Sequence, residues 1–154
     1  MPIIIFFIAA LILLGALYVW YIFFFPHMNP PLPKNMVTIG NMTFNVEIAS
    51  TTMEQTLGLS GRSGLGENQG MFFIFNGPGV QNFWMKDMKF SIDIIWIAGD
   101  KVAGFAQNAQ PQPGAPLWSL KIFTSPDYVD KVLEVNAGTV AKDGIKVGNS
   151  VKIQ

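Results

Sequence analysis

The chain has 154 residues, half of them hydrophobic, and its ten acidic and ten basic side chains cancel. This balance leaves no electrostatic footprint for nucleic acid. Cysteine is absent and histidine occurs once, which excludes disulfides, thiolate catalysis, a His-based triad in the domain and a His/Cys zinc site. We expect neither a metal nor a cofactor.

The chain begins with an uncharged apolar segment, residues 3–25, rich in Ile, Leu and Phe. As a helix this segment would span about 35 Å, enough to cross a hydrocarbon core of about 30 Å. Tyr18, Trp20 and Tyr21 lie toward its C-terminal end, where aromatic side chains favour the headgroup region. A cleaved signal peptide is the alternative, but the segment is too long and no small-residue cleavage site follows it. We therefore expect a transmembrane anchor over residues 1–26.

A Pro-rich linker, residues 27–35, is expected to connect this anchor to a globular domain, residues 36–154. His27 could bind a metal, but a solvated linker histidine is the preferred interpretation. The residues leave the orientation in the membrane open. Lys34 is the only basic residue near the anchor, and a single lysine favours a cytoplasmic domain only weakly.

The pattern of the domain predicts a mainly β structure. Alternating apolar residues between turn-forming residues are typical of strands. The expected fold class is α+β, a mostly antiparallel sheet or barrel-like domain with two short helices, preceded by one transmembrane helix. The main expected strands span residues 36–39, 42–49, 71–75, 102–106, 131–135 and 150–153, with further strands on both sides of residues 87–91.

Two short helices are expected between these strands. The first begins near Thr51, which has the spacing of a capping box with Glu54. Met53 and Leu57, together with Thr56, are expected to point inward from it. The second helix is expected within residues 138–143, before a glycine that can end it.

A long connection, residues 107–128, separates two of the expected strands. Its first half is rich in Gln, Pro and Ala, which is typical of an irregular surface loop. Connections of this length in small domains are often lids or binding loops. Because Trp118, Phe123 and Tyr128 make it partly apolar, we expect the connection to fold back over the body.

The most informative stretch is residues 83–98, FWMKDMKFSIDIIWIA, where charged side chains lie within apolar strands. Asp93 is surrounded by isoleucines, so its carboxylate must find a partner or raise its pKa. Alternate residues of a strand share a face. A hairpin that pairs Lys86 with Asp93 would therefore place Trp84 beside them. A register shift of one residue would put Asp93 opposite Asp87 instead.

Three interpretations of this stretch stay open. The plainest is a partly buried ion pair between Lys86 and Asp93 that fixes the strand register. The second is a pocket for a small polar ligand, with Trp84 as a stacking face. The third is catalysis, with Lys86 as base and Asp93 as acid or orienting group, or with Ser91 in a Ser-Lys dyad. The candidate ligand-binding residues are Trp84, Lys86, Asp87, Asp93, Asn108 and Glu134.

A calcium site is a further idea that the carboxylates raise. Asp87, Asp93 and Glu134 supply the oxygen ligands that Ca²⁺ prefers. They lack the spacing of an EF-hand loop, so no metal site is assigned to them.

Several ordered motifs of the domain resemble one known family. They are Gly70-Met71-Phe72, Phe83-Trp84-Met85-Lys86, Ile92-Asp93-Ile94, Asn108-Ala109, Phe123-Thr124-Ser125-Pro126 and the VLEVNAG of residues 132–138. Together they look like DUF192 (UPF0127), a prokaryotic domain of unknown function that often follows an export signal or a membrane anchor. The resemblance covers about residues 42–154. It implies a compact, mainly β fold and an extracytoplasmic position, but no reaction and no catalytic residue.

The chain departs from the family pattern at three positions. Asp87, Met88 and Ser91 stand where the family more often has Asn, Thr and Pro. Many members also carry cysteines after the Asn-Ala motif, and this chain has none. A role that needs that neutral amide or those cysteines is therefore not carried over.

These observations predict a single-pass protein of the plasma membrane with an extracytoplasmic C-terminal domain. The domain is expected to bind a small polar ligand or an envelope protein without catalysing a reaction. The alternative is an envelope hydrolase or lyase that uses Lys86 and Asp93. The expected partners are the membrane, through residues 3–25, and that ligand or envelope protein, with no role for nucleic acid.

Overall fold

The computed structural model describes residues 15–17, which are helical, and residues 32–154, which form a unit of their own. Apart from residues 15–17, the expected anchor lies outside these residues, and so does most of the expected linker. Within the described residues, no helix has the length and apolar character needed to cross a membrane.

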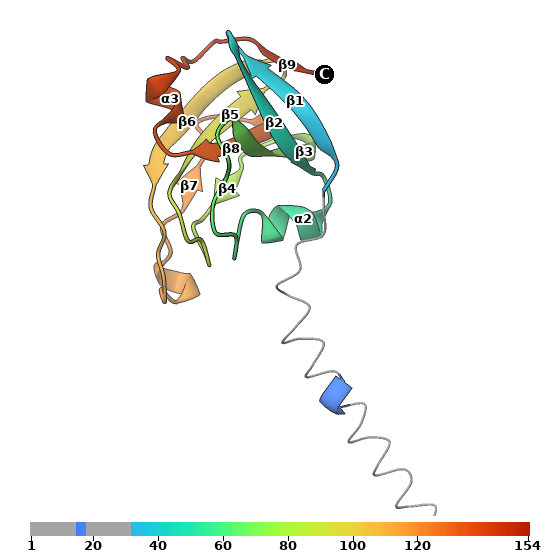
Figure 1. Ribbon diagram of the computed structural model, residues 1–154. Helices are drawn as coiled ribbons and strands as arrows, with labels where there is room; N and C mark the ends of the chain where they lie inside the picture. Colours follow the sequence, from blue (N-terminus) through green and yellow to red (C-terminus); the bar gives the residue numbers. More distant parts are fainter. Residues whose placement is uncertain (1–14, 18–31) are drawn as a thin grey trace, which may run out of the picture. The chain divides into compact units, whose positions relative to one another are not determined.

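Seven strands form the main sheet: β1 (Lys34–Ile39), β2 (Met42–Ala49), β3 (Gln69–Gly79), β5 (Ile92–Ala98), β6 (Lys101–Ala109), β8 (Val129–Asn136) and β9 (Val151–Ile153). Their order is β6-β5-β8-β3-β2-β1-β9, and the sheet curls into a half-barrel (Figure 1). All neighbouring strands are antiparallel except β2 and β3, which run parallel. The mainly β, mostly antiparallel α+β class is therefore confirmed.

Short elements cover the sheet. Helix α2 (Thr52–Leu57) connects β2 to β3, and α3 (Thr139–Lys142) precedes β9. A small antiparallel pair joins β4 (Asn82–Phe83) to β7 (Phe123–Thr124). A further short helix, η2 (Leu117–Ser119), lies in the expected irregular loop.

Helix α2 confirms one local prediction and corrects another. The side chain of Thr51 accepts from the backbone N–H of Glu54, whose carboxylate accepts from the N–H of Thr51 at 2.8 Å, so the expected capping box is present. The inward direction expected for Met53 is wrong, because this side chain is 80% exposed. A helix of six residues packs only part of its surface, and Met53 lies on the part that faces solvent.

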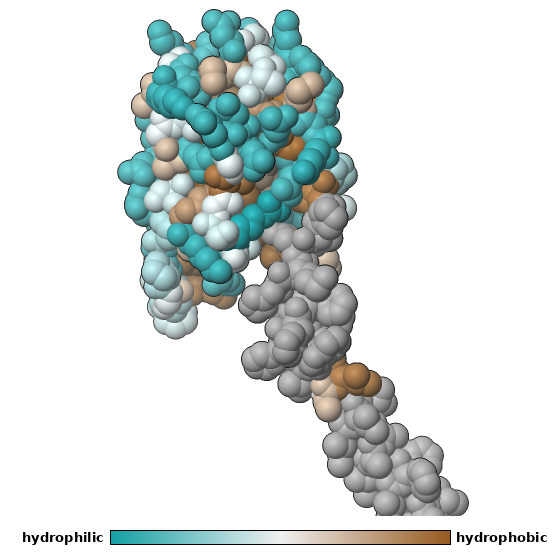
Figure 2. Space-filling view, in the orientation of Figure 1, coloured by the Kyte–Doolittle hydropathy of each residue, from teal (hydrophilic) through white to brown (hydrophobic). Residues whose placement is uncertain are grey.

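The long connection of residues 107–128 folds back only in part. Phe123 packs against the core, as expected, whereas Trp118 is 89% exposed and Tyr128 is also exposed. Figure 2 shows a mainly hydrophilic face with apolar side chains at the end where η2 lies in Figure 1. The apolar residues of this connection therefore divide between the core and the surface.

The sheet is buried on both faces, and its strands alternate between two clusters of apolar side chains. Ile92, Ile94 and Trp96 of β5 belong to one cluster, and Ile95 and Ile97 belong to the other. The first cluster is covered by the segment around β4 and by the residues after α2. The second lies within the curl of the sheet beside α3. Burial on both faces explains why β5 reads as a nearly continuous apolar run.

Close backbone contacts hold the curl. Lys101 and Ser150 form a bridge between the β5–β6 turn and the segment before β9, where the N–H of Val151 donates to the Asp100 carbonyl at 2.7 Å. In the centre, a Cβ at Gly70 would lie 2.6 Å from the Glu134 carbonyl oxygen. The absence of a side chain at Gly70 therefore allows β3 and β8 to approach each other closely beside Glu134.

Candidate functional site

The six candidate residues from the sequence lie in three separate places. Asp93 and Asn108 meet beside α3, Lys86 and Asp87 meet on a surface turn, and Trp84 and Glu134 line one cavity. Each place has a different chemistry.

Asp93 is a buried structural acceptor. Its side chain is 0% exposed. One carboxylate oxygen accepts from the N–H of Asn108 at 2.8 Å, and the other accepts from the N–H of Val140 in the first turn of α3, also at 2.8 Å. Because N–H groups at the start of a helix have no partner within the helix, Asp93 caps α3 from the neighbouring strand.

Lys86 pairs with its neighbour Asp87 and not with Asp93. Their side chains are 44% and 65% exposed, and Asp87 has a φ of 56° in a turn. The expected hairpin between Lys86 and Asp93 does not form. The physical reason is that β5 already pairs with β6 along one edge and β8 along the other, so neither edge is open to residues 84–86. The ion-pair interpretation and the catalytic pair of Lys86 with Asp93 are therefore wrong.

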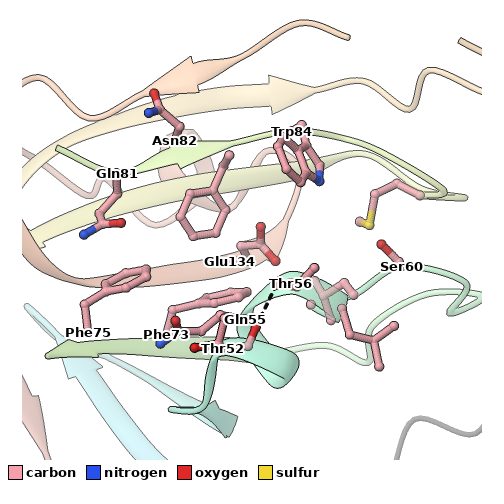
Figure 3. A pocket seen from close by; sticks show the side chains of 15 residues that line it. Thr52, Gln55, Thr56, Ser60, Phe73, Phe75, Gln81, Asn82, Trp84 and Glu134 are labelled. Carbon is pink, nitrogen blue, oxygen red and sulfur yellow. Dashed lines mark hydrogen bonds between the residues drawn. The ribbon is translucent and has the colours of Figure 1, made fainter. Parts of the chain in front are cut away.

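A cavity of about 190 Å³ lies between helix α2, the β3 strand, the β4 segment and β8. Fifteen residues line it, and Figure 3 shows their side chains around Glu134. Trp84 directly follows β4 in the chain, lies at the rim of the cavity and is 45% exposed. The pocket that the sequence suggested around Trp84 thus contains Glu134, whereas Asn108 and the three other charged candidates lie elsewhere.

Glu134 is the only ionisable residue among those lining the cavity. Its position in β8, opposite Ile94 of β5 and Met71 of β3, directs it to the cavity face of the sheet. It is only 5% exposed, and no described residue donates a hydrogen bond to its carboxyl group. Burial alone raises the pKa of Glu134 to about 8. A carboxyl in this state is either protonated or open to a partner other than the described residues.

Aromatic rings form the apolar wall of the cavity. Phe83 meets Phe73 edge to face with ring centroids 5.0 Å apart, and it meets Phe75 in the same manner at 6.4 Å. Such contacts fix the rings relative to one another. In Figure 3, Trp84 lies on one side of Glu134, and Phe73 lies with α2 on the other.

Polar side chains from α2 and the turn after it form the opposite wall. The Nε2 of Gln55 donates to the Ile74 carbonyl at 2.7 Å, and the Thr56 hydroxyl donates to the Thr52 carbonyl at 2.7 Å. The Ser60 hydroxyl donates to the Lys86 carbonyl at 2.9 Å. These hydrogens are directed to backbone carbonyls, so the side-chain oxygens keep their acceptor capacity.

The carboxylates do not form a metal centre in the part of the chain that the structure describes. No group of three His, Cys, Asp or Glu side chains lies there with the arrangement that a metal ion requires. Asp93 and Glu134 belong to opposite faces of the sheet, and Asp87 lies on the surface turn. The idea of a shared calcium site therefore has no geometric support.

A family model for DUF192, described as an uncharacterized ACR, matches residues 35–153. The chain belongs to the DUF192 family. The match includes the main sheet except for Lys34, the first residue of β1, and it includes every residue that lines the Glu134 cavity.

The solved structures similar to this DUF192 domain include two that cover most of this chain. A protein of unknown function from Novosphingobium aromaticivorans DSM 12444 is 33% identical, with a TM-score of 0.72 over 79% of this chain and 86% of that chain. A candidate transcription regulator from Sinorhizobium meliloti 1021 is 27% identical, with a TM-score of 0.73 over 82% of this chain and 98% of that chain. No curated protein is significantly similar to the chain.

Most of the residues around Glu134 in the DUF192 domain carry no signal in the sequence. Gln55, Thr56 and Ser60 read as ordinary helix and turn residues, and Phe73 and Phe75 read as one buried strand. The available signals were Trp84, which suggested a stacking face, and the acidic residue inside the apolar run VLEV of β8, the same kind of anomaly that drew attention to Asp93.

Proposed function

We propose that this DUF192 domain is a binding module for a small polar ligand, and that the ligand occupies the cavity around Glu134. The observation that carries the proposal is the buried carboxyl group of Glu134, which has no hydrogen-bond donor among the described residues and faces a cavity. Burying such a group without a partner is costly, so proteins rarely keep one without a use.

The lining of the cavity supports a binding role. Ligand sites are commonly concave and mainly apolar, with a few polar groups that orient the ligand. Here the rings of Phe73, Phe75 and Phe83 supply the apolar wall, and Gln55 and Ser60 supply polar oxygens. Trp84, at the rim, offers an aromatic surface that is already half exposed before binding.

A blocking variant tests this function. The full chain, purified in a mild detergent, is screened for stabilisation by a library of small polar compounds in thermal unfolding. Thr56→Trp would fill the cavity from helix α2, and Met53→Trp is its matched control, because Met53 lies on the same helix but is 80% exposed and outside the cavity. We expect compounds that stabilise the wild-type protein and Met53→Trp but not Thr56→Trp.

Two outcomes would contradict the proposed function. A library that stabilises no form of the chain would argue against a binding module. Compounds that stabilise Thr56→Trp as well as the wild-type protein would place the binding site elsewhere.

We also propose that residues 3–25 anchor the domain in the plasma membrane and that the domain faces the extracytoplasmic side. The support is the uncharged apolar sequence of this segment, which is long enough to span a bilayer as a helix. Protease added to intact spheroplasts is expected to degrade residues 32–154. Degradation only after lysis would contradict the orientation.

A further inference from the structure

Resting on the proposed binding function, we propose that the Glu134 cavity takes a small aliphatic primary amine in its ammonium form. The ammonium group would lie against the Glu134 carboxylate, and the aliphatic part would lie against the aromatic wall. Three features of the cavity support this class of ligand.

The first feature is an uncompensated acidic group. No Lys, Arg or His is among the residues lining the cavity, and the nearby Lys86 directs its ammonium group to Asp87 on the surface turn. The Glu134 carboxyl therefore has no cationic partner among the described residues. A buried carboxylate is strongly favoured by a cation within hydrogen-bond distance, so a cationic ligand supplies the missing partner.

The second feature is an excess of hydrogen-bond acceptors beside Glu134. The hydroxyl hydrogens of Thr56 and Ser60 are directed to backbone carbonyls, and a hydrogen of the Gln55 amide is used in the same way. What remains for a ligand at this wall is mainly oxygen lone pairs. A primary ammonium group carries three donors and no acceptor, which is the complement of this wall.

Amide donors lie in a different part of the cavity. In Figure 3, Gln81 and Asn82 are grouped away from Thr56 and Ser60. The Oδ1 of Asn82 accepts from the Thr124 hydroxyl at 2.8 Å, so its amide group is held by β7. An anionic ligand would need such donors beside Glu134 as well.

The third feature is the aromatic wall and the size of the space. Aromatic faces such as those of Trp84 and Phe83 attract cations, most strongly where water is excluded. The volume of about 190 Å³ slightly exceeds that of the engineered cavity of roughly 150 Å³ that binds benzene. An amine with about four carbon atoms therefore fits.

Isothermal titration calorimetry of the full chain in a mild detergent tests the ligand class. The probes are n-butylamine, its neutral analogue 1-butanol, and tetramethylammonium, a cation that has no hydrogen-bond donor. We expect n-butylamine to bind at least tenfold more tightly than either analogue. We also expect Glu134→Gln to lower the affinity for n-butylamine at least tenfold. The control Glu67→Gln, at an exposed carboxylate outside the cavity, should leave this affinity unchanged.

Proton release is a second measurement. Near neutral pH the unliganded Glu134 carboxyl is mostly protonated, because burial raises its pKa to about 8. Binding of the ammonium ion stabilises the carboxylate, so about one proton should be released, which appears as a dependence of the binding heat on the buffer. The release should be absent in Glu134→Gln and unchanged in Glu67→Gln.

Three results would contradict the proposal that the ligand is a primary amine. They are equal binding of 1-butanol or tetramethylammonium, equal binding of n-butylamine by Glu134→Gln, and the failure of n-butylamine to bind at all. If library compounds still stabilise the wild-type protein but not Thr56→Trp, the binding function stands and only the ligand class is wrong. If the library also fails, both proposals are wrong.

Discussion

Asp93 and Glu134 are two buried carboxyl groups on adjacent strands, and they have opposite surroundings. Asp93 is opposite Val135 in the pairing of β5 with β8, and Glu134 is opposite Ile94, so the two side chains leave opposite faces of the sheet. Asp93 accepts two backbone hydrogen bonds, whereas no described residue donates one to Glu134. Burial alone therefore does not distinguish a structural carboxylate from a candidate ligand site, but the presence of donors does.

The difference has an energetic consequence. Hydrogen bonds to a charged group each contribute roughly 1.5–3 kcal/mol, so Asp93 stabilises the fold through the start of α3 and the turned backbone at Asn108. Glu134 has only the cost of desolvation, with nothing in the described residues to offset it. We infer that the fold depends on Asp93, while Glu134 weakens the unliganded domain.

The largest expected effect is the loss of Asp93. Asp93→Ala should lower the free energy of unfolding by about 3 kcal/mol, because it leaves the buried N–H of Val140 and the partly buried N–H of Asn108 without an acceptor. Asp93→Asn should lower it less, since one oxygen is kept. Urea denaturation measures both. Asp100→Ala, at an exposed turn, is the control with an expected change below about 0.5 kcal/mol. If Asp93→Ala were as stable as the wild-type protein, Asp93 would not have the structural role that distinguishes it here from Glu134.

The next effect is the pH dependence that Glu134 introduces. Its pKa rises from 4.5, the ordinary value that applies in the unfolded chain, to about 8 in the folded protein. Between these values the folded state holds a proton that the unfolded state has lost, so stability falls as pH rises, by up to about 1.4 kcal/mol per pH unit. The contribution is flat below pH 4.5 and again above about pH 8.

Glu134→Gln should remove this slope, so its advantage over the wild-type protein should grow from about pH 5 to about pH 8. Urea denaturation at several pH values within this range measures the difference. Glu67→Gln should follow the wild-type profile, because Glu67 is exposed on the surface. Parallel profiles for Glu134→Gln and the wild-type protein would show that Glu134 is not buried without a partner.

The smallest expected effect concerns the caps of the two helices. Helix α3 donates a hydrogen bond from the Val140 N–H to its capping residue Asp93 across the fold, whereas α2 is capped locally by Thr51 and Glu54. Thr51→Ala should lower the free energy of unfolding by about 1 kcal/mol, the usual value for an N-cap. Met53→Ala on the same helix should change it less, since that side chain is 80% exposed. An effect as large as that of Asp93→Ala would contradict the distinction between local and long-range caps.

Local spacing was sufficient to predict most of the strands, including β1 and β2, and the start of α2. The alternation within each strand and the Thr51–Glu54 spacing depend on residues close in the chain, so local sequence contains the residues involved. The inward direction of Met53 was wrong because a helix of six residues has no apolar period long enough to define its buried face.

By itself the sequence determined that this is a mainly β domain and that carboxyl groups at positions 93 and 134 lie within apolar strands. Only the tertiary structure decided which carboxyl receives donors. β5 lies between β6 and β8, so residues 84–86 cannot pair with it and Asp93 turns to α3. Glu134 meets α2 and the β4 segment, which are far from it in the chain. The partner of a buried side chain depends on strand order and register, which join distant segments and leave no mark in local spacing.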